Sequence, residues 1–311
     1  MGLISFSKRV IRQVLVLKFP GNDNRLLAGQ SAIHSMLSRR ADFRYLWDAE
    51  VKVFSQWGED GILTYLCWEL ELIKPNVIEF GVGDFSECNS RFLAEFLNAN
   101  VVAVDVMEEL RDNNLDNDLR WKTHFTPLVH WITPEQAMED LSSARMVLGG
   151  IDIVSLDLDG NDYWIMNNLD LSGVSIVVVE YNALFGPTST VTIPRDDSFS
   201  RTKAHFSNLY YGASLSAWIC LMTKKNFRFI GSNLVGNNAF FVANKNLGKL
   251  NLPLPEISDL SIYTNWYVRE GRDINSDLTL RNAFESKIDI GHLELYDVLS
   301  HEIYLVSELS D

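Results

Sequence analysis

The chain has 311 residues, of which 47% are hydrophobic and 22% charged, so it can bury a normal core and extensive disorder is excluded. Its formal net charge of −14 argues against non-specific binding to nucleic acid, because the phosphates would be repelled. The three cysteines form no CxxC pair and are too few for a zinc cluster or a disulfide framework, which indicates buried thiols in a reducing cytoplasm.

Positive charge is concentrated at the start of the chain. Residues 1–50 have a balance of +4, which leaves −18 for residues 51–311 out of the net charge of −14. Residues 3–19 mix apolar side chains with basic ones at near-helical spacing, which fits two interpretations. One is a helix that contacts an anionic membrane surface through residues 1–20, and the other is a helix that packs on its own domain. No apolar run approaches the roughly 20 residues that span a bilayer, so we expect a cytoplasmic protein, peripheral to the inner membrane in the first case.

From about residue 58 onward, helical and strand patterns alternate. Apolar residues recur every three or four positions in the predicted helices, whereas the predicted strands are short apolar runs. The helices are expected at 59–73, 88–100, 134–144 and 162–169, and the strands at 76–80, 101–105, 126–132, 151–157 and 174–180. The last two strands are almost continuously apolar, which is typical of a parallel sheet covered on both faces.

A long polar segment, residues 181–212, separates this alternation from the final elements. A helix at 213–226 and two strands at 226–231 and 238–243 follow. So short a connection between strands permits only an antiparallel hairpin. We therefore predict an α/β fold of the Rossmann-like kind, with a mostly parallel seven-stranded sheet, a terminal antiparallel β-hairpin, and N- and C-terminal helical appendages. The expected divisions are 1–50, 51–245 and 246–311.

The turn after the first strand has the composition of a cofactor-binding loop. Gly81 and Gly83 would let backbone amides approach a ligand, and a helix begins just beyond. A dinucleotide fingerprint has glycine where this chain has Ser86, so that match is incomplete. Asp105 closes the next strand, where an acid can accept both hydroxyls of a ribose. Together these residues favour a nucleoside cofactor over a purely structural turn.

The sequence E-F-G-V-G, with Asp105 on the next strand, resembles class I S-adenosylmethionine-dependent methyltransferases over residues 51–245. In that superfamily the glycine loop faces the methionine part of the cofactor and the second-strand acid holds the ribose. The resemblance implies a class I methyltransferase fold and S-adenosyl-L-methionine as cofactor. The contacts it implies in this part of the chain are made by Glu79, Gly81, Val82, Gly83, Ser86 and Asp105.

Further segments are similar to FkbM-like methyltransferases, which are often associated with bacterial surface glycans. They are SQWGEDGIL at 55–63, SLDLDGNDYW at 155–164 and VVVEYN at 177–182. This likeness implies further cofactor contacts by Gln56, Gly58, Glu59 and Asp60. The alternative is that Glu59 and Asp60 only complement the positive end of the helix that they begin.

Acidic side chains follow two neighbouring strands. Asp157 closes one strand and Asp159 follows it, while Glu180 closes the next strand and Asn182 lies just beyond. Carboxyl ends of adjacent strands open into one crevice, where these groups would repel unless a cation, a proton or a donor-rich substrate were present. Hard oxygen ligands suit Mg²⁺ or Mn²⁺.

The placement of these acids also looks like that in metal-dependent O-methyltransferases, including macrocin-type sugar enzymes. The likeness implies Asp157, Glu180 and Asn182 as metal ligands, although Tyr181 interrupts the usual acid–amide pair. In a metal-free alternative, the carboxylates bind sugar hydroxyls or act as the base.

The remaining candidates lie on loops. A base is expected among Asp157, Asp159 and His205, and an ordinary solvent-exposed loop histidine is the alternative for His205. Tyr211 is expected to stack on a sugar ring, with core packing as the alternative. His130, at the end of the third strand, is either near the adenine or an ordinary strand-end residue.

These observations lead to one preferred function and two alternatives. The preferred function is an S-adenosylmethionine-dependent O-methyltransferase that acts on a sugar or glycan hydroxyl, as in a bacterial surface polysaccharide. The alternatives are an NAD-dependent nucleotide-sugar oxidoreductase and a non-catalytic binding module with a methyltransferase fold.

Overall fold

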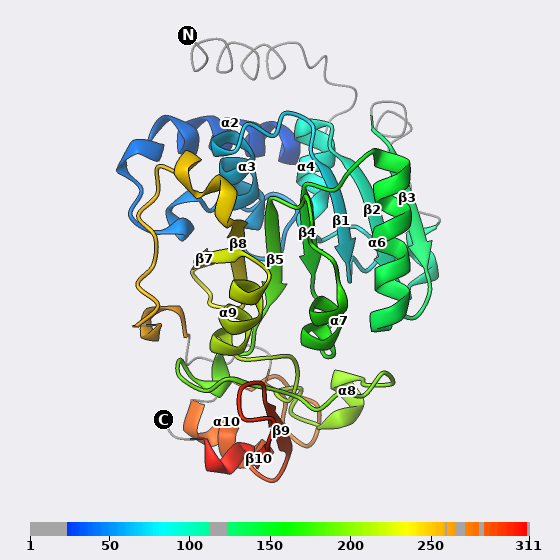
Figure 1. Ribbon diagram of the computed structural model, residues 1–311, viewed down its shortest axis with the longest axis vertical. Coiled ribbons are helices and arrows are strands. Elements are labelled where there is room, and N and C mark those ends of the chain that lie inside the picture. The colour runs from blue at the N-terminus through cyan, green and yellow to red at the C-terminus, as the bar shows by residue number, and fades with distance from the viewer. Residues whose placement is uncertain (1–23, 112–122, 259, 265–270, 280–282, 310–311) are drawn as a thin grey trace. The chain divides into compact units, whose positions relative to one another are not determined.

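The computed structural model describes residues 24–111, 123–258, 260–264, 271–279 and 283–309 (Figure 1). The segment 1–20, for which a membrane contact was predicted, lies outside these residues. Within the described ranges, none of the helices has both the length and the apolar composition needed to cross a bilayer.

Seven strands form the main sheet in the order β3-β2-β1-β4-β5-β8-β7. Their bounds are β1 Asn76–Phe80, β2 Asn100–Asp105, β3 Phe125–Val129, β4 Ile153–Leu156, β5 Ile176–Glu180, β7 Phe227–Ser232 and β8 Asn238–Ala243. β1 pairs with β2 and β2 with β3 in parallel, whereas β8 is antiparallel to both β5 and β7. The predicted α/β fold, with a mostly parallel sheet and a terminal antiparallel hairpin, is confirmed.

The helices differ in whether the side chain of the residue before them caps their first turn. Their bounds are α2 Asn24–Ser38, α3 Glu59–Glu69, α4 Asn89–Leu97, α6 Pro134–Leu148, α7 Asp162–Asn168, α8 Arg201–Ala204, α9 Leu215–Lys224 and α10 Ala283–Ile290. The short 3-10 helices are η1 Arg40–Asp42, η2 Leu46–Ala49, η3 Glu108–Leu110, η4 Ala183–Phe185, η5 Asn244–Lys249, η6 Ser261–Tyr263 and η7 Val306–Glu308. The side chain of Ser214, for example, accepts a hydrogen bond from the amide of Ala217 at 3.1 Å and so caps α9.

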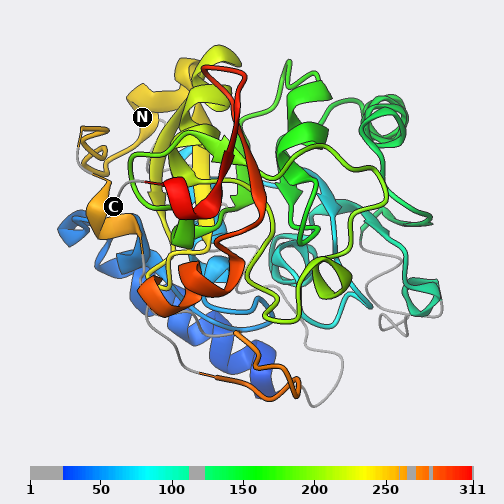
Figure 2. The same ribbon diagram turned by 90° about the horizontal axis from the view of Figure 1, so that it is seen from below.

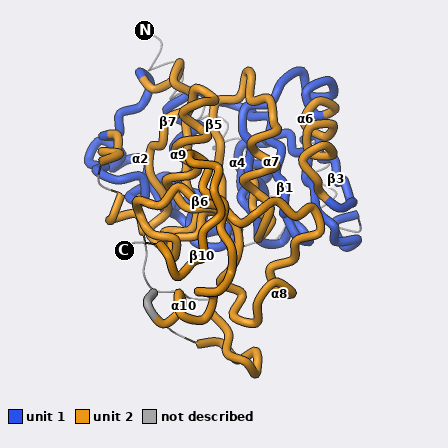
Figure 3. The backbone as a smooth tube through the Cα atoms, turned by 60° about the horizontal axis from the view of Figure 1, so that its bottom comes forward, with its two compact units in different colours: residues 1–131, 144–155, 248–253 blue, residues 132–143, 156–247, 254–311 orange. Residues whose placement is uncertain are grey.

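The chain divides into two compact units, each made of segments that are separated in the sequence (Figure 3). Unit 1 comprises residues 1–131, 144–155 and 248–253, and unit 2 comprises residues 132–143, 156–247 and 254–311. The divisions expected after residues 50 and 245, which run in chain order, stay a prediction. Each unit is described by itself below.

A second, three-stranded sheet in unit 2 was not predicted. It has the order β10-β9-β6, with β6 Val191–Thr192, β9 Glu294–Asp297 and β10 Ile303–Leu305. The long polar segment therefore contains a strand, and the expected C-terminal helical appendage contributes the other two (Figure 2). The two segments also share an apolar core made of Leu184, Phe185, Val191, Ile193, Leu209, Tyr210, Ile290, Leu295 and Val306. A strand of two residues is too short to show an alternating pattern, so the sequence did not reveal this pairing.

Candidate functional site

In unit 1, a glycine turn follows the buried strand β1. Gly81 has φ +88° and Gly83 has φ +59°, backbone conformations that favour glycine at both positions. The amide of Gly81 donates to the carbonyl of Val104 at 2.9 Å, which holds the turn against the end of β2. The predicted glycine turn is therefore present, and its backbone has no side chain at residues 81 and 83 that would block a ligand.

Asp105, at the end of β2, fixes this turn through its carboxylate. Oδ2 accepts a hydrogen bond from the amide of Gly83 at 2.7 Å, and Oδ1 accepts one from the amide of Met107 at 3.0 Å. An ionised carboxylate has about four lone-pair positions, so two backbone bonds leave room for two hydroxyl donors. The partly exposed Asp105 thus fits the diol of a ribose.

Three other residues predicted to contact the cofactor have different surroundings. Glu79 is buried, and its carboxylate accepts hydrogen bonds from the amides of Asn89 at 2.9 Å and Ser90 at 2.7 Å. It therefore satisfies the first turn of α4, and burial raises its pKa. Val82 is buried as a whole residue, whereas Ser86 is exposed.

The segment before α3 is held together by the two acids that begin this helix. The Oε2 atom of Glu59 accepts hydrogen bonds from the amides of Trp57 at 3.0 Å and Gly58 at 2.9 Å. The Oδ2 atom of Asp60 accepts three, from the amides of residues 53–55, at 2.7, 2.6 and 2.9 Å. Both carboxylates thus accept hydrogen bonds from the backbone that precedes the helix. This role is close to the alternative in which Glu59 and Asp60 only stabilise the start of α3. The side chain of Gln56 is partly exposed.

Asp60 should make stability depend on pH. Burial raises its pKa from 3.8 to about 6, although hydrogen bonds from residues 53–55 lower it. Between pH 4 and 6 the folded protein then holds a proton that the unfolded chain has lost, so the free energy of unfolding falls as pH rises. Relative to an Asp60→Asn variant, the wild type should lose about 2 kcal/mol over this interval, measured by urea unfolding.

An Asp84→Asn variant is the control for this titration. Asp84 is exposed, and its hydrogen bonds with Ser86 lower its pKa, so its effect should have the opposite sign. If the difference in the free energy of unfolding between the wild type and Asp60→Asn stays constant from pH 4 to 6, the prediction is wrong.

His130 lies just beyond β3 in unit 1. Its Nδ1 atom is 3.1 Å from the carbonyl oxygen of Trp131, and the residue is partly exposed.

Unit 2 contains an acidic cluster of three carboxylates, from Asp157, Asp159 and Glu180. One oxygen from each lies within 4.8 Å of the other two. Glu180 is only 7% exposed, and its Oε2 atom has no hydrogen-bond partner within the described residues. Burial raises the pKa of Glu180 well above its usual value, and the charges of Asp157 and Asp159 raise it further. The predicted convergence at the ends of β4 and β5 is therefore present, and these hard oxygen donors fit a divalent cation.

Asn182, predicted as a third metal ligand, bonds to the backbone instead. Its amide nitrogen donates to the carbonyls of Leu209 at 3.0 Å and Tyr211 at 3.1 Å, and its oxygen accepts from the amide of Leu184 at 3.1 Å. These bonds tie the end of β5 to residues 209–211. The side chain of Asn182 is thus used by backbone hydrogen bonds, whereas Asp159 brings a carboxylate to the cluster of Asp157 and Glu180.

Arg201, on α8, reaches this acidic cluster. Its Nη1 atom pairs with Asp159, its Nε donates to the carbonyl of Asn208 at 2.7 Å, and its guanidinium carbon lies 3.8 Å from the ring centroid of Tyr211. Burial acts to lower the pKa of Arg201, but Tyr211, Glu180 and Asp159 raise it above its ordinary value. Tyr211 therefore joins the acidic cluster through Arg201. The sequence of the long polar segment did not indicate that Arg201 would pair with Asp159.

His205, a candidate base, has other neighbours. Its Nδ1 atom lies 2.7 Å from the hydroxyl of Ser207, and its ring centroid is 5.8 Å from that of His292. Burial, with a smaller effect of His292, lowers its pKa. None of these neighbours belongs to the acidic cluster.

Residues 193–201, which we call the strap, contact the turn between β4 and α7. The amide nitrogen of Asn161 donates to the carbonyl of Asp196 at 2.6 Å, and the indole of Trp164 donates to the carbonyl of Ile193 at 2.9 Å. A Cβ atom at Gly160 would lie 2.4 Å from the ring of Phe199, so glycine permits this close approach. The strap is thus held against residues 160–164, which follow Asp157 and Asp159 in the chain.

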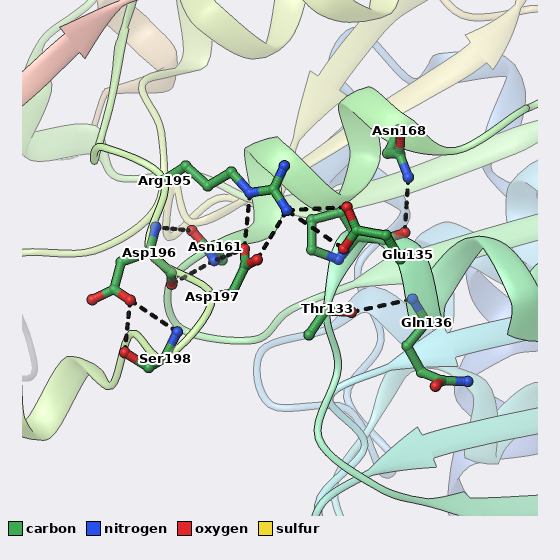
Figure 4. A network of polar contacts seen from close by, with 10 residues as sticks. Thr133, Glu135, Gln136, Asn161, Asn168, Arg195, Asp196, Asp197 and Ser198 are labelled. Atoms are coloured by element: carbon green, nitrogen blue, oxygen red, sulfur yellow. Dashed lines mark hydrogen bonds and ion pairs between the residues drawn. The ribbon is translucent and has the colours of Figure 1, made fainter.

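An exposed ion-pair network extends from the strap (Figure 4). Arg195 pairs with Asp197 at 2.9 Å and with Glu135 on α6 at 3.1 Å. These partners are solvent-exposed, so the pairs contribute little stability, but they place Arg195 among residues outside the acidic cluster.

Comparisons with known proteins found only distant similarity. No protein-family profile and no curated protein sequence matches the chain. Among solved structures, a methyltransferase from Geobacter sulfurreducens is 15% identical over 75% of this chain and 94% of its own, with a TM-score of 0.35. Human N-acetylserotonin methyltransferase, solved in complex with S-adenosylmethionine, is 11% identical over 78% and 66%, with a TM-score of 0.35. A fibrillarin pre-rRNA processing protein from Methanococcus jannaschii is 8% identical over 55% and 67%, with a TM-score of 0.36.

Proposed function

We propose that this protein is an S-adenosylmethionine-dependent O-methyltransferase whose acceptor is a hydroxyl of a sugar or glycan. The observation that carries the proposal is the glycine turn after β1, whose Gly83 amide is bound by Asp105 at the end of β2. It occurs in a sheet that is parallel around β1 and ends in an antiparallel hairpin, as the resemblance to class I methyltransferases implies. In this proposal the turn takes the methionine part of the cofactor and Asp105 takes the ribose.

When bound, S-adenosylmethionine supplies a methyl group on a positively charged sulfur. The protein has to hold an acceptor oxygen in line with that methyl group and to remove the proton of the hydroxyl. The acidic cluster in unit 2 suits the second task, because its carboxylates accept hydrogen bonds from hydroxyl groups and Glu180 Oε2 is a buried oxygen without a partner among the described residues. A polar, donor-rich acceptor such as a sugar matches these oxygens.

The finer part of the proposal is a divalent cation, Mg²⁺ or Mn²⁺, in the acidic cluster. Three carboxylates, one of which has a buried oxygen without a partner among the described residues, are a ligand set that hard cations prefer. Asp157, Asp159 and Glu180 would hold the ion. Its chemical contribution would be to lower the pKa of the acceptor hydroxyl.

The cofactor assignment predicts that Asp105→Ala weakens binding of S-adenosylmethionine at least tenfold, or about 1.4 kcal/mol. The variant removes both the ribose acceptor and the bond that fixes Gly83. Isothermal titration calorimetry of the wild type and the variant with S-adenosylmethionine, S-adenosylhomocysteine and NAD measures this directly.

Asp152→Ala is a matched control for that substitution. The Asp152 carboxylate also accepts one backbone hydrogen bond in unit 1, from the amide of Asn76 at 2.8 Å, but at the beginning of β1 rather than at its end. We expect this variant to keep the wild-type affinity for the cofactor. Equal affinities of Asp105→Ala and the wild type would remove the ribose assignment, and preferential binding of NAD would reject the proposed activity.

A further inference from the structure

The acidic cluster already contains a positive charge supplied by the protein itself. Asp157, Asp159 and Glu180 would bring three negative charges to one small volume if all were ionised, and Arg201 pairs with one of them, Asp159. The charge of Arg201 also acts on Glu180, where it opposes the rise in pKa that burial and the two aspartates cause. Arg201 is thus an internal counter-ion of this cluster.

The Arg201 side chain is only 11% exposed, and three of its contacts hold it in place. They are the hydrogen bond to Asn208, the stacking on Tyr211 and the pairing with Asp159. The first two lie within residues 201–211, whereas the third crosses to the turn after β4. Asp159 therefore connects Arg201 to the other two carboxylates, although its own side chain is 55% exposed.

We propose that Arg201 competes with a divalent cation for Asp159, so that cation binding breaks the Arg201–Asp159 pair and frees α8 from the turn after β4. This inference rests on the cation that forms part of the proposed function. It adds that occupancy of the acidic cluster controls the attachment of residues 201–211.

The competition follows from position and charge. The Asp159 oxygen that pairs with Arg201 belongs to the same carboxylate that would bind the cation, and a guanidinium beside a cation repels it. Glu180 Oε2, which is buried and unpartnered, gives the cation a ligand that Arg201 does not satisfy. Removing the guanidinium should therefore strengthen cation binding, whereas a residue that only positions Asp159 would weaken it when removed.

The experiment measures Mn²⁺ binding to the full chain by electron paramagnetic resonance, without cofactor. Arg201→Met should bind Mn²⁺ at least tenfold more tightly than the wild type, since methionine can still pack on Tyr211 but carries no charge. Arg201→Lys should lie between them, because lysine keeps the charge but lacks the planar fork that pairs with a carboxylate. Arg195→Met removes an arginine of the strap that pairs outside the acidic cluster, and it should bind Mn²⁺ like the wild type.

Hydrogen–deuterium exchange supplies the second measurement. Adding Mn²⁺ to the wild type should speed exchange in residues 201–211, and Arg201→Met should exchange at the faster rate without Mn²⁺. Equal or weaker Mn²⁺ binding by Arg201→Met, or no Mn²⁺ binding by either protein, would overturn the proposal. If Arg201→Met does not fold, the same comparison is made with Arg201→Lys. Failure here leaves binding of S-adenosylmethionine untouched, so it is distinguishable from failure of the proposed activity.

Discussion

Replacing Glu180 by glutamine should lower methyl transfer at least 100-fold while the affinity for S-adenosylmethionine stays within twofold of the wild type. Glu180 offers a buried oxygen without a hydrogen-bond partner at the end of β5, beside Asp157 and Asp159. Both of its proposed roles, accepting a proton and binding a cation, require a carboxylate, and loss of a general base typically costs between 10²- and 10⁴-fold. The assay is transfer of labelled methyl from S-adenosylmethionine to a sugar acceptor.

The same substitution should not destabilise the fold. A buried carboxylate beside two others is costly to ionise, so glutamine should leave the free energy of unfolding unchanged or raise it. Glu135→Gln, at an exposed acid of unit 2 that pairs with Arg195, is the matched control and should keep full activity. Normal turnover by Glu180→Gln would exclude Glu180 from the reaction, even if the cofactor binds as predicted.

Replacing Gly61 by alanine should destabilise unit 1 by at least about 3 kcal/mol, at the upper end of the usual cost of overpacking. A Cβ atom at this position in α3 would lie 2.1 Å from the carbonyl oxygen of Ala49 and 2.3 Å from the amide nitrogen of Val51. These atoms belong to the backbone, so they cannot rotate away as a side chain could. Urea unfolding measures the loss.

The consequence of this clash extends to the predicted cofactor contacts. The amide of Gly61 donates to the carbonyls of Val51 and Gly58, both at 3.1 Å, so a displaced α3 would also shift the segment that contains Gln56 and Gly58. Gly248→Ala is the control, because a Cβ atom there would meet nothing within 4 Å. A Gly61→Ala variant as stable as the wild type would show that residues 49–51 can move apart from α3.

Local sequence patterns determined most of the main sheet. The apolar runs at 76–80 and 101–105 became β1 and β2 with nearly unchanged bounds, because a strand buried on both faces needs consecutive apolar residues. The short connection between residues 232 and 238 likewise required an antiparallel hairpin, since no crossover fits into it. The positions of Gly83, Asp105, Asp157 and Glu180 at strand ends follow from these assignments, and so does the meeting of the last two in one cluster.

Tertiary structure alone decided which polar groups are used by the fold and which remain for a ligand. Asn182 and Glu180 both follow β5, yet Asn182 bonds to the backbone of residues 209 and 211 while Glu180 keeps an unpartnered oxygen. The pairing of Arg201 with Asp159, 42 residues apart, and that of β6 with β9 depend on contacts between distant segments. Such contacts leave no period of two or 3.6 in the chain, because each depends on where two segments meet and not on the pattern within either one.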